Sequence, residues 1–201
     1  DVITGHARLL GGGGLEVNGG RIEGRNIVIA TRSAPAIPPI PRLANVGYHT
    51  TESIFEISTL PAELTIIGAG AIGVELGQAF ARLGSRVRIL ESSATLLPRE
   101  DHELVAMLHE MLVAEGVELL LGTTVRGVSR EGARITVECE RQGTGARSIG
   151  SDALLVATGR QARTSDLGLE AARVQVTSRG VVVDDRVGTT ARAIWAAEGV
   201  G

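Results

Sequence analysis

The stretch LTIIGAGAIGVELGQAFARLGSRVRILE, residues 64–91, decides the fold. It begins with an apolar run that predicts a buried strand, continues with six residues that fit GxGxxG, and ends with a second strand over residues 86–90. Between the strands, Gly84 stands where a helix should end, and apolar residues recur at helical spacing at Ile72, Leu76, Phe80 and Leu83. Strand, glycine turn, helix and strand in this order predict a βαβ unit that binds a dinucleotide.

The glycine turn supplies the positions that such a unit needs to hold a pyrophosphate. Gly68 permits the tight turn, Gly70 lets the backbone approach the phosphates, and Gly73 lets the helix pack closely against the strand. The free N–H groups and the positive dipole end of the helix would then face the phosphates. The candidate pyrophosphate-binding residues are Gly68, Ala69, Gly70, Ala71, Ile72 and Gly73.

An acidic residue, Glu91, ends the second strand about 20 residues past the glycines, where it would accept hydrogen bonds from both ribose hydroxyls. A carboxylate at this position would repel a 2′-phosphate. The following residues, Ser92 to Ala94, include no arginine that could bind one. The sequence therefore predicts that NAD(H) is preferred over NADP(H), with Ser92 beside Glu91 in the site.

The composition argues against several classes of protein. A net charge of −3 and a pI near 5.9 do not suit a nucleic-acid-binding surface, which needs clustered positive charge. No apolar run approaches the roughly 18 residues of a membrane span, so the expected setting is the cytoplasm, without a membrane partner. Cys139 is the single cysteine of the sequence, and it can form neither an internal disulfide nor a two-cysteine redox centre.

The sequence before this unit predicts strands and an extended connection. Short strands are expected at residues 3–10 and 15–17, joined by a flexible hairpin connection at Gly11 to Gly14, and a central strand is expected at residues 26–31. Residues 33–61 carry five of the six prolines and predict an extended segment that crosses between domains.

After the βαβ unit, a helix is expected from about Asp101 to Gly116, with an apolar face of Leu104, Leu108, Met111 and Leu112. A third parallel strand should follow at residues 117–121. Residues 124–140 alternate between apolar and polar and predict an antiparallel meander, with residues 142–150 as its turn-rich edge. Further strands are expected at residues 153–160, 180–184 and 193–197. The predicted fold class is α/β, a Rossmann-like parallel sheet with an antiparallel β-meander.

Several linked motifs resemble the pyridine nucleotide-disulfide oxidoreductases, the family of dihydrolipoyl dehydrogenase, glutathione reductase and mercuric reductase. They are the turn at Ala30-Thr31, the glycine block through Glu75, the second turn at residues 157–160, and a Val-Val-Val-Asp strand before a Thr-Thr pair. Residues 33–41, 78–84 and 154–160 look most like the mercuric reductase branch. The resemblance covers essentially the whole chain.

In that family, an NAD(P)-binding domain is inserted within an FAD-binding domain. The resemblance implies that residues 62–160 form the NAD(H)-binding domain, and that residues 1–61 and 161–201 are partial FAD-domain segments at both ends. The family's redox-active cysteine pair would precede these residues, and its dimerisation domain would follow them. The chain is therefore expected to be the central fragment of a homodimeric, FAD-dependent NAD(P)H oxidoreductase, and to be catalytically incomplete alone.

The resemblance also implies roles for individual residues. The parent enzyme would pass electrons from NADH through FAD to a disulfide or metal-thiolate acceptor, and this portion would position the nicotinamide for hydride transfer to FAD. Glu75 and Gly159 would lie near the nicotinamide. The second turn would contribute Ala157, Thr158, Gly159 and Arg160 to the cofactor site. No residue of the chain is assigned to acid–base or thiol catalysis.

Three positions depart from the family pattern. Arg32 stands where the family has a turn glycine, and Glu198-Gly199 stand where it has Gly-Asp, whose aspartate contacts FAD. The family pairs the glutamate equivalent to Glu75 with a lysine beside the flavin, and this sequence has no lysine.

Two other interpretations stay open. A module that binds NAD(H) without turnover fits the missing cysteine pair, and an NADH oxidase or ferredoxin reductase-type flavoprotein would share both dinucleotide motifs. His102 and His109 are seven residues apart and do not fit HExxH, so no metal site is predicted. Cys139 lies on the apolar side of a predicted strand and is expected to be a buried structural thiol.

Overall fold

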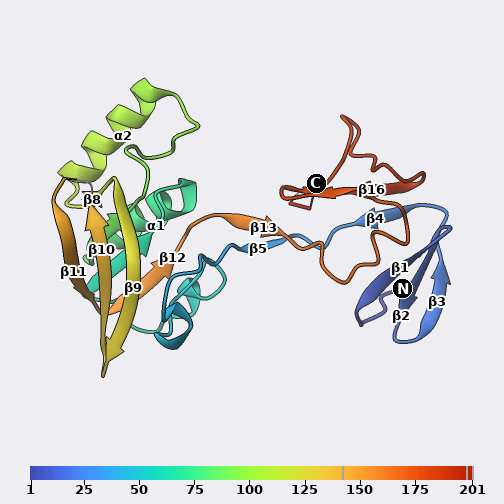
Figure 1. The fold of residues 1–201 in the computed structure, drawn as a ribbon, viewed down its shortest axis with the longest axis horizontal. Helices are drawn as coiled ribbons and strands as arrows, with labels where there is room; N and C mark the ends of the chain where they lie inside the picture. Colours follow the sequence, from blue (N-terminus) through green and yellow to red (C-terminus); the bar gives the residue numbers. More distant parts are fainter. Residues whose placement is uncertain (142, 198, 201) are drawn as a thin grey trace. The chain divides into compact units, whose positions relative to one another are not determined.

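The computed structural model describes residues 1–141, 143–197 and 199–200, which form two compact units (Figure 1). The first unit consists of Asp1–Ala34 together with Arg160–Gly201, and the second consists of Pro35–Gly159. The second unit is thus inserted into the sequence of the first. The boundary falls after residue 34 rather than after residue 61, because residues 35–61 contribute Leu43, Val46 and Ile54 to the cores of the second unit.

The second unit is built on a four-stranded sheet with the order β12 (Ala153–Val156), β6 (Glu63–Ile67), β7 (Arg86–Leu90) and β8 (Glu118–Leu120). All three pairings in this sheet are parallel. The helix α1 (Ala71–Arg82) connects β6 to β7, and α2 (His102–Ala114) connects β7 to β8. The βαβ unit predicted from residues 64–91 is therefore present, as is the third parallel strand.

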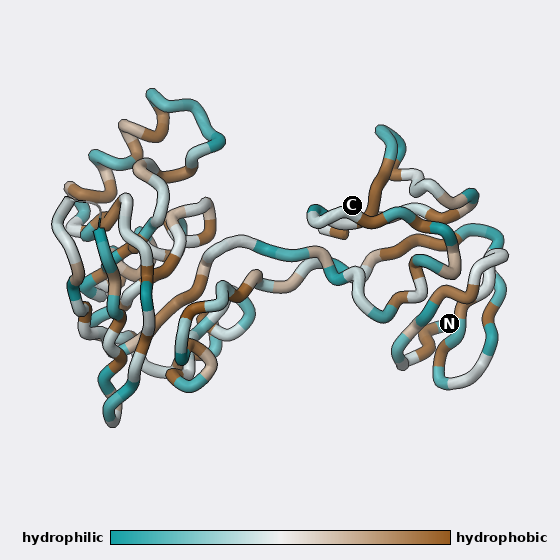
Figure 2. The backbone as a smooth tube through the Cα atoms, viewed as in Figure 1, coloured by the Kyte–Doolittle hydropathy of each residue, from teal (hydrophilic) through white to brown (hydrophobic). Residues whose placement is uncertain are grey.

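Each face of the parallel sheet buries its own apolar layer. Along β6, Leu64 and Ile66 face the helices and Ile67 faces the opposite side, because side chains alternate along a strand. On that opposite side, Ile67 packs against the antiparallel sheet of β9 (Thr123–Glu131), β10 (Arg134–Arg141) and β11 (Gly145–Ser151). In Figure 2, brown apolar segments run through the strands of this unit. The result is a layer of helices, a parallel sheet and a meander.

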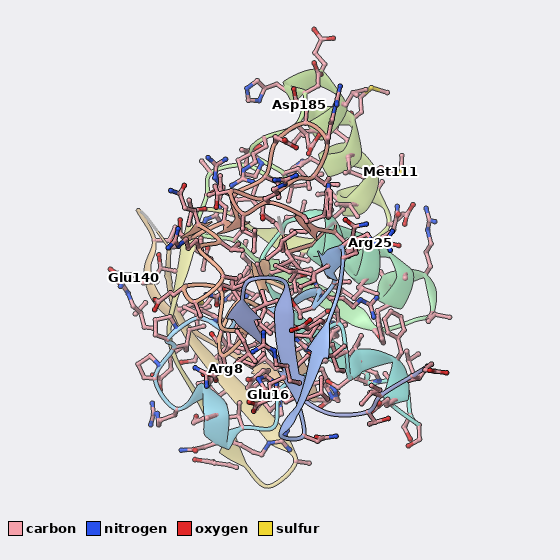
Figure 3. All side chains as sticks on the ribbon, turned by 90° about the vertical axis from the view of Figure 1, so that its right-hand side faces the viewer. Arg8, Glu16, Arg25, Met111, Glu140 and Asp185 are labelled. Atoms are coloured by element: carbon pink, nitrogen blue, oxygen red, sulfur yellow. The ribbon has the colours of Figure 1, made fainter. Side chains whose placement is uncertain are left out.

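The two helices bury narrower faces than their apolar spacing predicts. Leu83, expected on the apolar face of α1, is 66% exposed. On α2, Leu104 and Met111 are 66% and 48% exposed, whereas Val105 and Leu112 are buried; Figure 3 shows Met111 at the surface. Periodicity identifies a helix, but the width of the covered stripe depends on the neighbouring elements.

The strand β11 replaces the turn-rich edge predicted for residues 142–150. It pairs with β10 along its whole length, from Gly145 opposite Arg141 to Ser151 opposite Ile135. Residue 142 lies outside the described residues. The first four residues of β11 are exposed and polar or small, so the strand lacks the apolar alternation that would reveal it in the sequence.

Two short 3-10 helices, η1 (Leu43–Asn45) and η2 (Ile54–Glu56), interrupt the segment before β6. Both lie in the second unit, where each buries one apolar residue. Residues 33–61 are therefore not extended throughout, as their prolines predict. Burial of apolar side chains against the sheet folds this segment back onto the second unit.

The first unit contains small sheets and, among its described residues, no helix. Antiparallel strands β1 (Ala7–Gly11), β2 (Gly14–Val17) and β3 (Gly20–Glu23) form one sheet, and β3 was not predicted. The strand β4 (Ile27–Ile29) pairs in parallel with β16 (Ile194–Ala196). Two further pairs are β14 (Val176–Thr177) with β15 (Gly180–Val181) and β5 (Ser33–Pro35) with β13 (Arg160–Ala162).

The strand β4 differs from the buried central strand that its apolar run predicts. Among the described residues, it has one sheet neighbour, β16. Ile27 and Ile29 are buried, but Val28 between them is 61% exposed. One face of β4 is therefore covered and the other is not.

Candidate functional site

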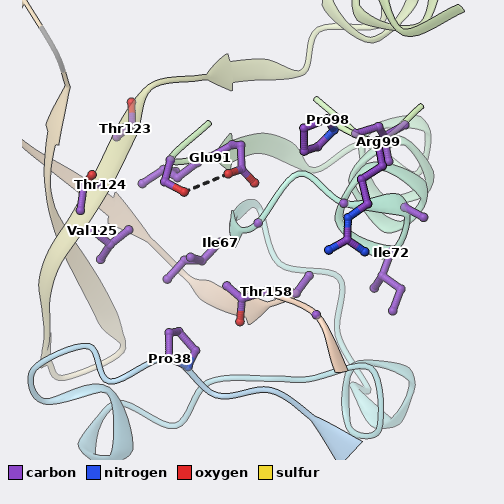
Figure 4. A pocket seen from close by; sticks show the side chains of 18 of the residues that line it. Pro38, Ile67, Ile72, Glu91, Pro98, Arg99, Thr123, Thr124, Val125 and Thr158 are labelled. Atoms are coloured by element: carbon purple, nitrogen blue, oxygen red, sulfur yellow. Dashed lines mark hydrogen bonds between the residues drawn. The ribbon is translucent and has the colours of Figure 1, made fainter. Parts of the chain in front are cut away.

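A cleft of about 640 Å³ lies at the carboxyl end of the parallel sheet, within the second unit (Figure 4). Its walls come from the glycine turn after β6, the ends of β7 and β12, the start of β9 and the loop before α2. Ligands of open α/β sheets bind in this place, outside the carboxyl ends of the strands. The volume is also within the range of about 300–1,000 Å³ that is typical of small-molecule sites.

The glycine turn brings its backbone against β12 and α1. Gly68 has a φ of 105°, and a Cβ there would lie 2.5 Å from the carbonyl oxygen of Ala157. A Cβ on Gly73 would collide with the carbonyl oxygen of Gly68. A Cβ on Gly70 would meet no atom within 4 Å, and Gly70 lines the cleft. Two glycines therefore allow close packing, and the third leaves the backbone open toward the cleft.

The first turn of α1 presents N–H groups at the cleft. Gly70 is the N-cap residue, and the N–H of Val74 donates to its carbonyl at 3.0 Å. The N–H groups of residues 71–73 come before this bond and have no intrahelical acceptor. Ala71 and Ile72 line the cleft, so a bound anion would meet these N–H groups and the positive end of the helix dipole.

Glu91 sits at the end of β7 and is half-buried in the wall of the cleft. Its Oε2 accepts a hydrogen bond from the N–H of Ala69 at 2.8 Å, and its Oε1 accepts from the N–H of Ser93 at 2.8 Å and the hydroxyl of Ser92 at 3.0 Å. Burial alone would raise the pKa of Glu91, but these donors together lower it below the ordinary value of 4.5. Glu91 is therefore a carboxylate at neutral pH, and it ties the glycine turn to β7.

The second turn, after β12, forms another part of the wall. The N–H of Ala157 donates to the carbonyl of Ile67 at 2.8 Å, and the hydroxyl of Thr158 donates to the carbonyl of Ala36 at 2.7 Å. Gly159 has a φ of 115°, and its carbonyl accepts a hydrogen bond from the N–H of Ala36 at 2.9 Å. These bonds hold the start and the end of the second unit side by side.

The structure brings together most of the residues that the sequence proposed for the site. The nine that line the cleft are Gly68, Gly70, Ala71, Ile72, Glu91, Ser92, Ala157, Thr158 and Gly159.

Four other proposed residues do not line the cleft. Ala69 and Gly73 are buried in the turn itself. Glu75 is exposed on α1, because α1 runs away from the turn and its fifth residue is already more than one helical turn beyond Gly70. Arg160 belongs to the first unit, where its guanidinium donates to the hydroxyl and the carbonyl of Ser33 at 2.7 Å.

The cleft also contains residues that the sequence analysis missed. Pro38 and Ile40 come from the proline-rich segment, and Thr123 to Val125 come from the start of β9. Arg99 comes from the loop before α2, which follows Ser92 to Ala94 in the sequence. The signal that could have found this loop is its position after the second strand, since loops at the carboxyl ends of parallel strands meet at one edge.

Other residues that the sequence analysis considered lie outside the cleft. Cys139 is a buried free thiol, and burial raises its pKa. Among the residues that the structure describes, no group of three His, Cys, Asp or Glu side chains could hold a metal ion, and no helix has the length and apolar character needed to cross a membrane. Arg32 has a φ of 62°, in the left-handed region that glycine favours. Residue 198 lies outside the described residues.

Comparison with known proteins gives one consistent result. The family model described as pyridine nucleotide-disulphide oxidoreductase matches residues 1–200. The chain is 38% identical over 198 residues to mercuric reductase from Bacillus cereus, covering 98% of the chain and 31% of that protein. It is 37% identical over 202 residues to dihydrolipoyl dehydrogenase from Pseudomonas aeruginosa, covering 98% of the chain and 42% of that protein.

Among solved structures, the HOCl-induced flavoprotein disulfide reductase RclA from Escherichia coli is similar, with a TM-score of 0.89 and 36% sequence identity. The match covers 99% of this chain and 45% of that one. The chain thus spans between about a third and a half of the length of these proteins.

Proposed function

The chain belongs to the pyridine nucleotide-disulphide oxidoreductase family, and we propose that its second unit binds NAD(H) and positions the nicotinamide for hydride transfer to FAD in a larger flavoprotein. The observation that carries this proposal is the cleft at the carboxyl end of the parallel sheet. In it, the open backbone at Gly70, the first turn of α1 and the Glu91 carboxylate occur in the order that a dinucleotide requires.

Each part of the cleft suits one part of the cofactor. The N–H groups at the start of α1 would bind the pyrophosphate, and Glu91 would accept hydrogen bonds from the adenosine ribose. NAD(H) supplies the hydride chemistry when bound, and the protein orients it and excludes water. Thr158 and Gly159 line the wall formed by the second turn, and we assign them to the nicotinamide side. Glu75 does not line the cleft, and its place near the nicotinamide rests on the resemblance to the family alone.

The charge of Glu91 supports NAD(H) over NADP(H). Its three internal hydrogen bonds keep the carboxylate ionised and fix its position, so a 2′-phosphate placed beside it would be repelled. Arg99 also lines the cleft, but Figure 4 shows its side chain directed toward Ile72, in the first turn of α1, and not toward Glu91. We therefore assign the ribose to Glu91 and Ser92.

We assign FAD to the whole flavoprotein and not to this chain alone. An apolar pocket of about 120 Å³ lies beside β4 in the first unit. The redox partner of FAD, whether a disulfide, a metal-thiolate or another acceptor, is likewise assigned to the larger protein, which we propose to be a homodimer. Cys139 is buried and single, so a module that binds NAD(H) without turnover is the second candidate function for the chain by itself.

Calorimetric titration of the 201-residue chain with NADH and with NADPH, at the same low ionic strength, tests the proposal. We expect saturable binding of NADH and weaker binding of NADPH. In the variant Glu91→Arg, NADH binding should weaken and NADPH binding should strengthen, because the repulsion of the 2′-phosphate becomes an attraction. Failure of the chain to bind either nucleotide would contradict the proposal, and an unchanged preference in Glu91→Arg would mean that the ribose is recognised elsewhere.

A further inference from the structure

The loop between β7 and α2 holds an arginine at the cleft. The N–H of Leu97 donates to the carbonyl of Ala69 at 3.2 Å, which attaches the loop to the glycine turn. The N–H of Glu100 then donates back to the carbonyl of Leu97 at 2.9 Å, and Asp101 caps α2. Arg99 lies between these fixed points, so its backbone is held at the cleft.

The described residues that line the cleft include one cationic side chain that could bind an anionic ligand. Among the described lining residues, the charged ones are Glu91, Arg99 and Glu100, two acids and one base. The Glu91 carboxylate accepts hydrogen bonds from Ala69, Ser92 and Ser93, and its negative charge would repel an anionic ligand. Arg99 has no hydrogen bond or ion pair among the residues that the structure describes. Eight other arginines of the second unit do donate to a carboxylate or a carbonyl: Arg42, Arg82, Arg86, Arg88, Arg126, Arg130, Arg134 and Arg147.

We infer that Arg99 binds the pyrophosphate of the dinucleotide, an inference that rests on the function proposed above. The helix N-terminus contributes only about half a positive charge, whereas a pyrophosphate brings two negative charges into a cleft that already holds two acids. A guanidinium supplies a full charge and several N–H donors that match phosphate oxygens. Figure 4 shows the Arg99 side chain directed toward Ile72 and the first turn of α1, where the N–H groups for the same phosphates lie.

The variant Arg99→Gln tests this inference, with Arg141→Gln as the matched control. Arg141 is an exposed arginine of the same unit that does not line the cleft, so the control loses the same charge elsewhere. Kd values for NADH, NADPH and adenosine are measured with the 201-residue chain. We expect Arg99→Gln to raise the Kd of NADH and of NADPH by the same factor, about tenfold, because both contain the pyrophosphate. Adenosine should bind equally to the variant and the unsubstituted chain, and the NADH effect should shrink at high salt.

Four results would overturn the assignment of Arg99. A loss confined to NADPH would place Arg99 on the 2′-phosphate, and an equal loss for adenosine would show that Arg99 only maintains the shape of the cleft. Unchanged binding of NADH in Arg99→Gln would remove it from the site while leaving the proposed function intact. If the unsubstituted chain binds no NADH, the proposed function and the role of Arg99 fail together.

Discussion

Two glycine-rich turns of this molecule look alike in sequence and differ in construction. Residues 11–14 are four consecutive glycines, whereas residues 68–73 contain three glycines in six positions. The first turn joins β1 to β2 as a hairpin, with Gly11 opposite Gly14. The second joins β6 to α1 and lines the cleft. The number of glycines does not make a turn suitable for binding an anion. A helix that starts immediately after the turn makes it suitable, because the free N–H groups of the helix face the anion.

The two turns also differ in what surrounds them. A Cβ on Gly12 would meet no atom within 4 Å, and its φ of 62° shows that glycine serves the curvature of the hairpin. In the turn at residues 68–73, a Cβ on Gly73 would collide with the backbone, so glycine there permits close packing. The same residue type therefore meets a conformational need in one turn and a need for space in the other.

The two units carry different spectroscopic reporters, so each turn can be tested by itself. Both α-helices of the described residues lie in the second unit, and Trp195, the single tryptophan of the sequence, lies in the first. Helical circular dichroism therefore follows the unfolding of the second unit, and tryptophan fluorescence follows the first.

The largest effect is expected for Gly73→Ala. The added methyl group must displace the backbone of Gly68, and overpacking of this kind costs about 3 kcal/mol of unfolding free energy. Urea denaturation followed by circular dichroism should show a lower midpoint. As a control, Ala79→Val adds methyl groups at an exposed position of α1 and should cost only about 0.5 kcal/mol. Equal costs for the two variants would show that Gly73 is not a packing glycine.

A second large effect, on binding rather than stability, is expected for Gly70→Val. The backbone at Gly70 is extended, with φ −73° and ψ −179°, and a Cβ there meets no protein atom within 4 Å, so the fold should persist. The new side chain would project into the space proposed for the pyrophosphate, and the Kd for NADH should rise at least about hundredfold. Calorimetry and circular dichroism of the same sample check both parts. NADH binding at the original affinity would remove the pyrophosphate from this turn.

A smaller effect is expected from Glu91→Gln. The turn at residues 68–73 is held by a hydrogen bond to the Glu91 carboxylate, and the hairpin turn at residues 11–14 has no such bond among the described residues. The folded state lowers the pKa of Glu91, so the stabilisation is complete above the ordinary value of 4.5 and is lost as the pH falls through the lowered pKa. At neutral pH, the variant should be less stable by about 1.5 kcal/mol, because the amide has a single acceptor oxygen, and its NH₂ group cannot accept the hydrogen bonds that the other carboxylate oxygen accepts.

Urea denaturation followed by circular dichroism across this pH range tests the carboxylate. The difference in stability between Glu91→Gln and the unsubstituted chain should narrow in acid. Glu100→Gln is the control, since Glu100 is exposed and its side chain has no hydrogen bond among the described residues. A difference between Glu91→Gln and the unsubstituted chain that stays constant with pH would show that the charge is not what stabilises the turn.

The smallest effect is expected for Gly12→Ala in the first turn. Alanine must adopt the left-handed conformation there, which costs about 1 kcal/mol, and part of this cost is offset by the reduced entropy of the unfolded chain. Trp195 fluorescence should report a slightly lower midpoint, and NADH binding should not change. Weaker NADH binding in this variant would mean that the two turns are not as different as their structures indicate.

The βαβ unit could be predicted from the sequence because its signals are local. Residues 64–91 contain the strand, the turn glycines, the helix and the acid within one contiguous stretch, and the structure places each where the pattern predicts. The parallel strand β8 and the N-cap Asp101 of α2 follow from the same kind of signal.

What could not be predicted depends on contacts between distant parts of the chain. β11 is a strand because β10 pairs with it, although its own residues are mostly exposed. Leu83 and Met111 are exposed although helical spacing places both on the apolar faces of their helices. Arg99 lines the cleft because Leu97 bonds to Ala69, nearly 30 residues earlier in the chain. Helical spacing and motif patterns carry no information about such contacts.

The hydrogen bond between Ala36 and Gly159 has a consequence for the order of folding. Closing a loop of about 125 flexible residues costs roughly 4 kcal/mol of chain entropy. Once the second unit has folded, that bond already holds the two ends of the insertion together, so β4 can pair with β16 without a further search across that loop. The folded second unit therefore holds the two segments of the first unit close together in space. We expect β4 and β16 of the first unit to pair only after the second unit has folded.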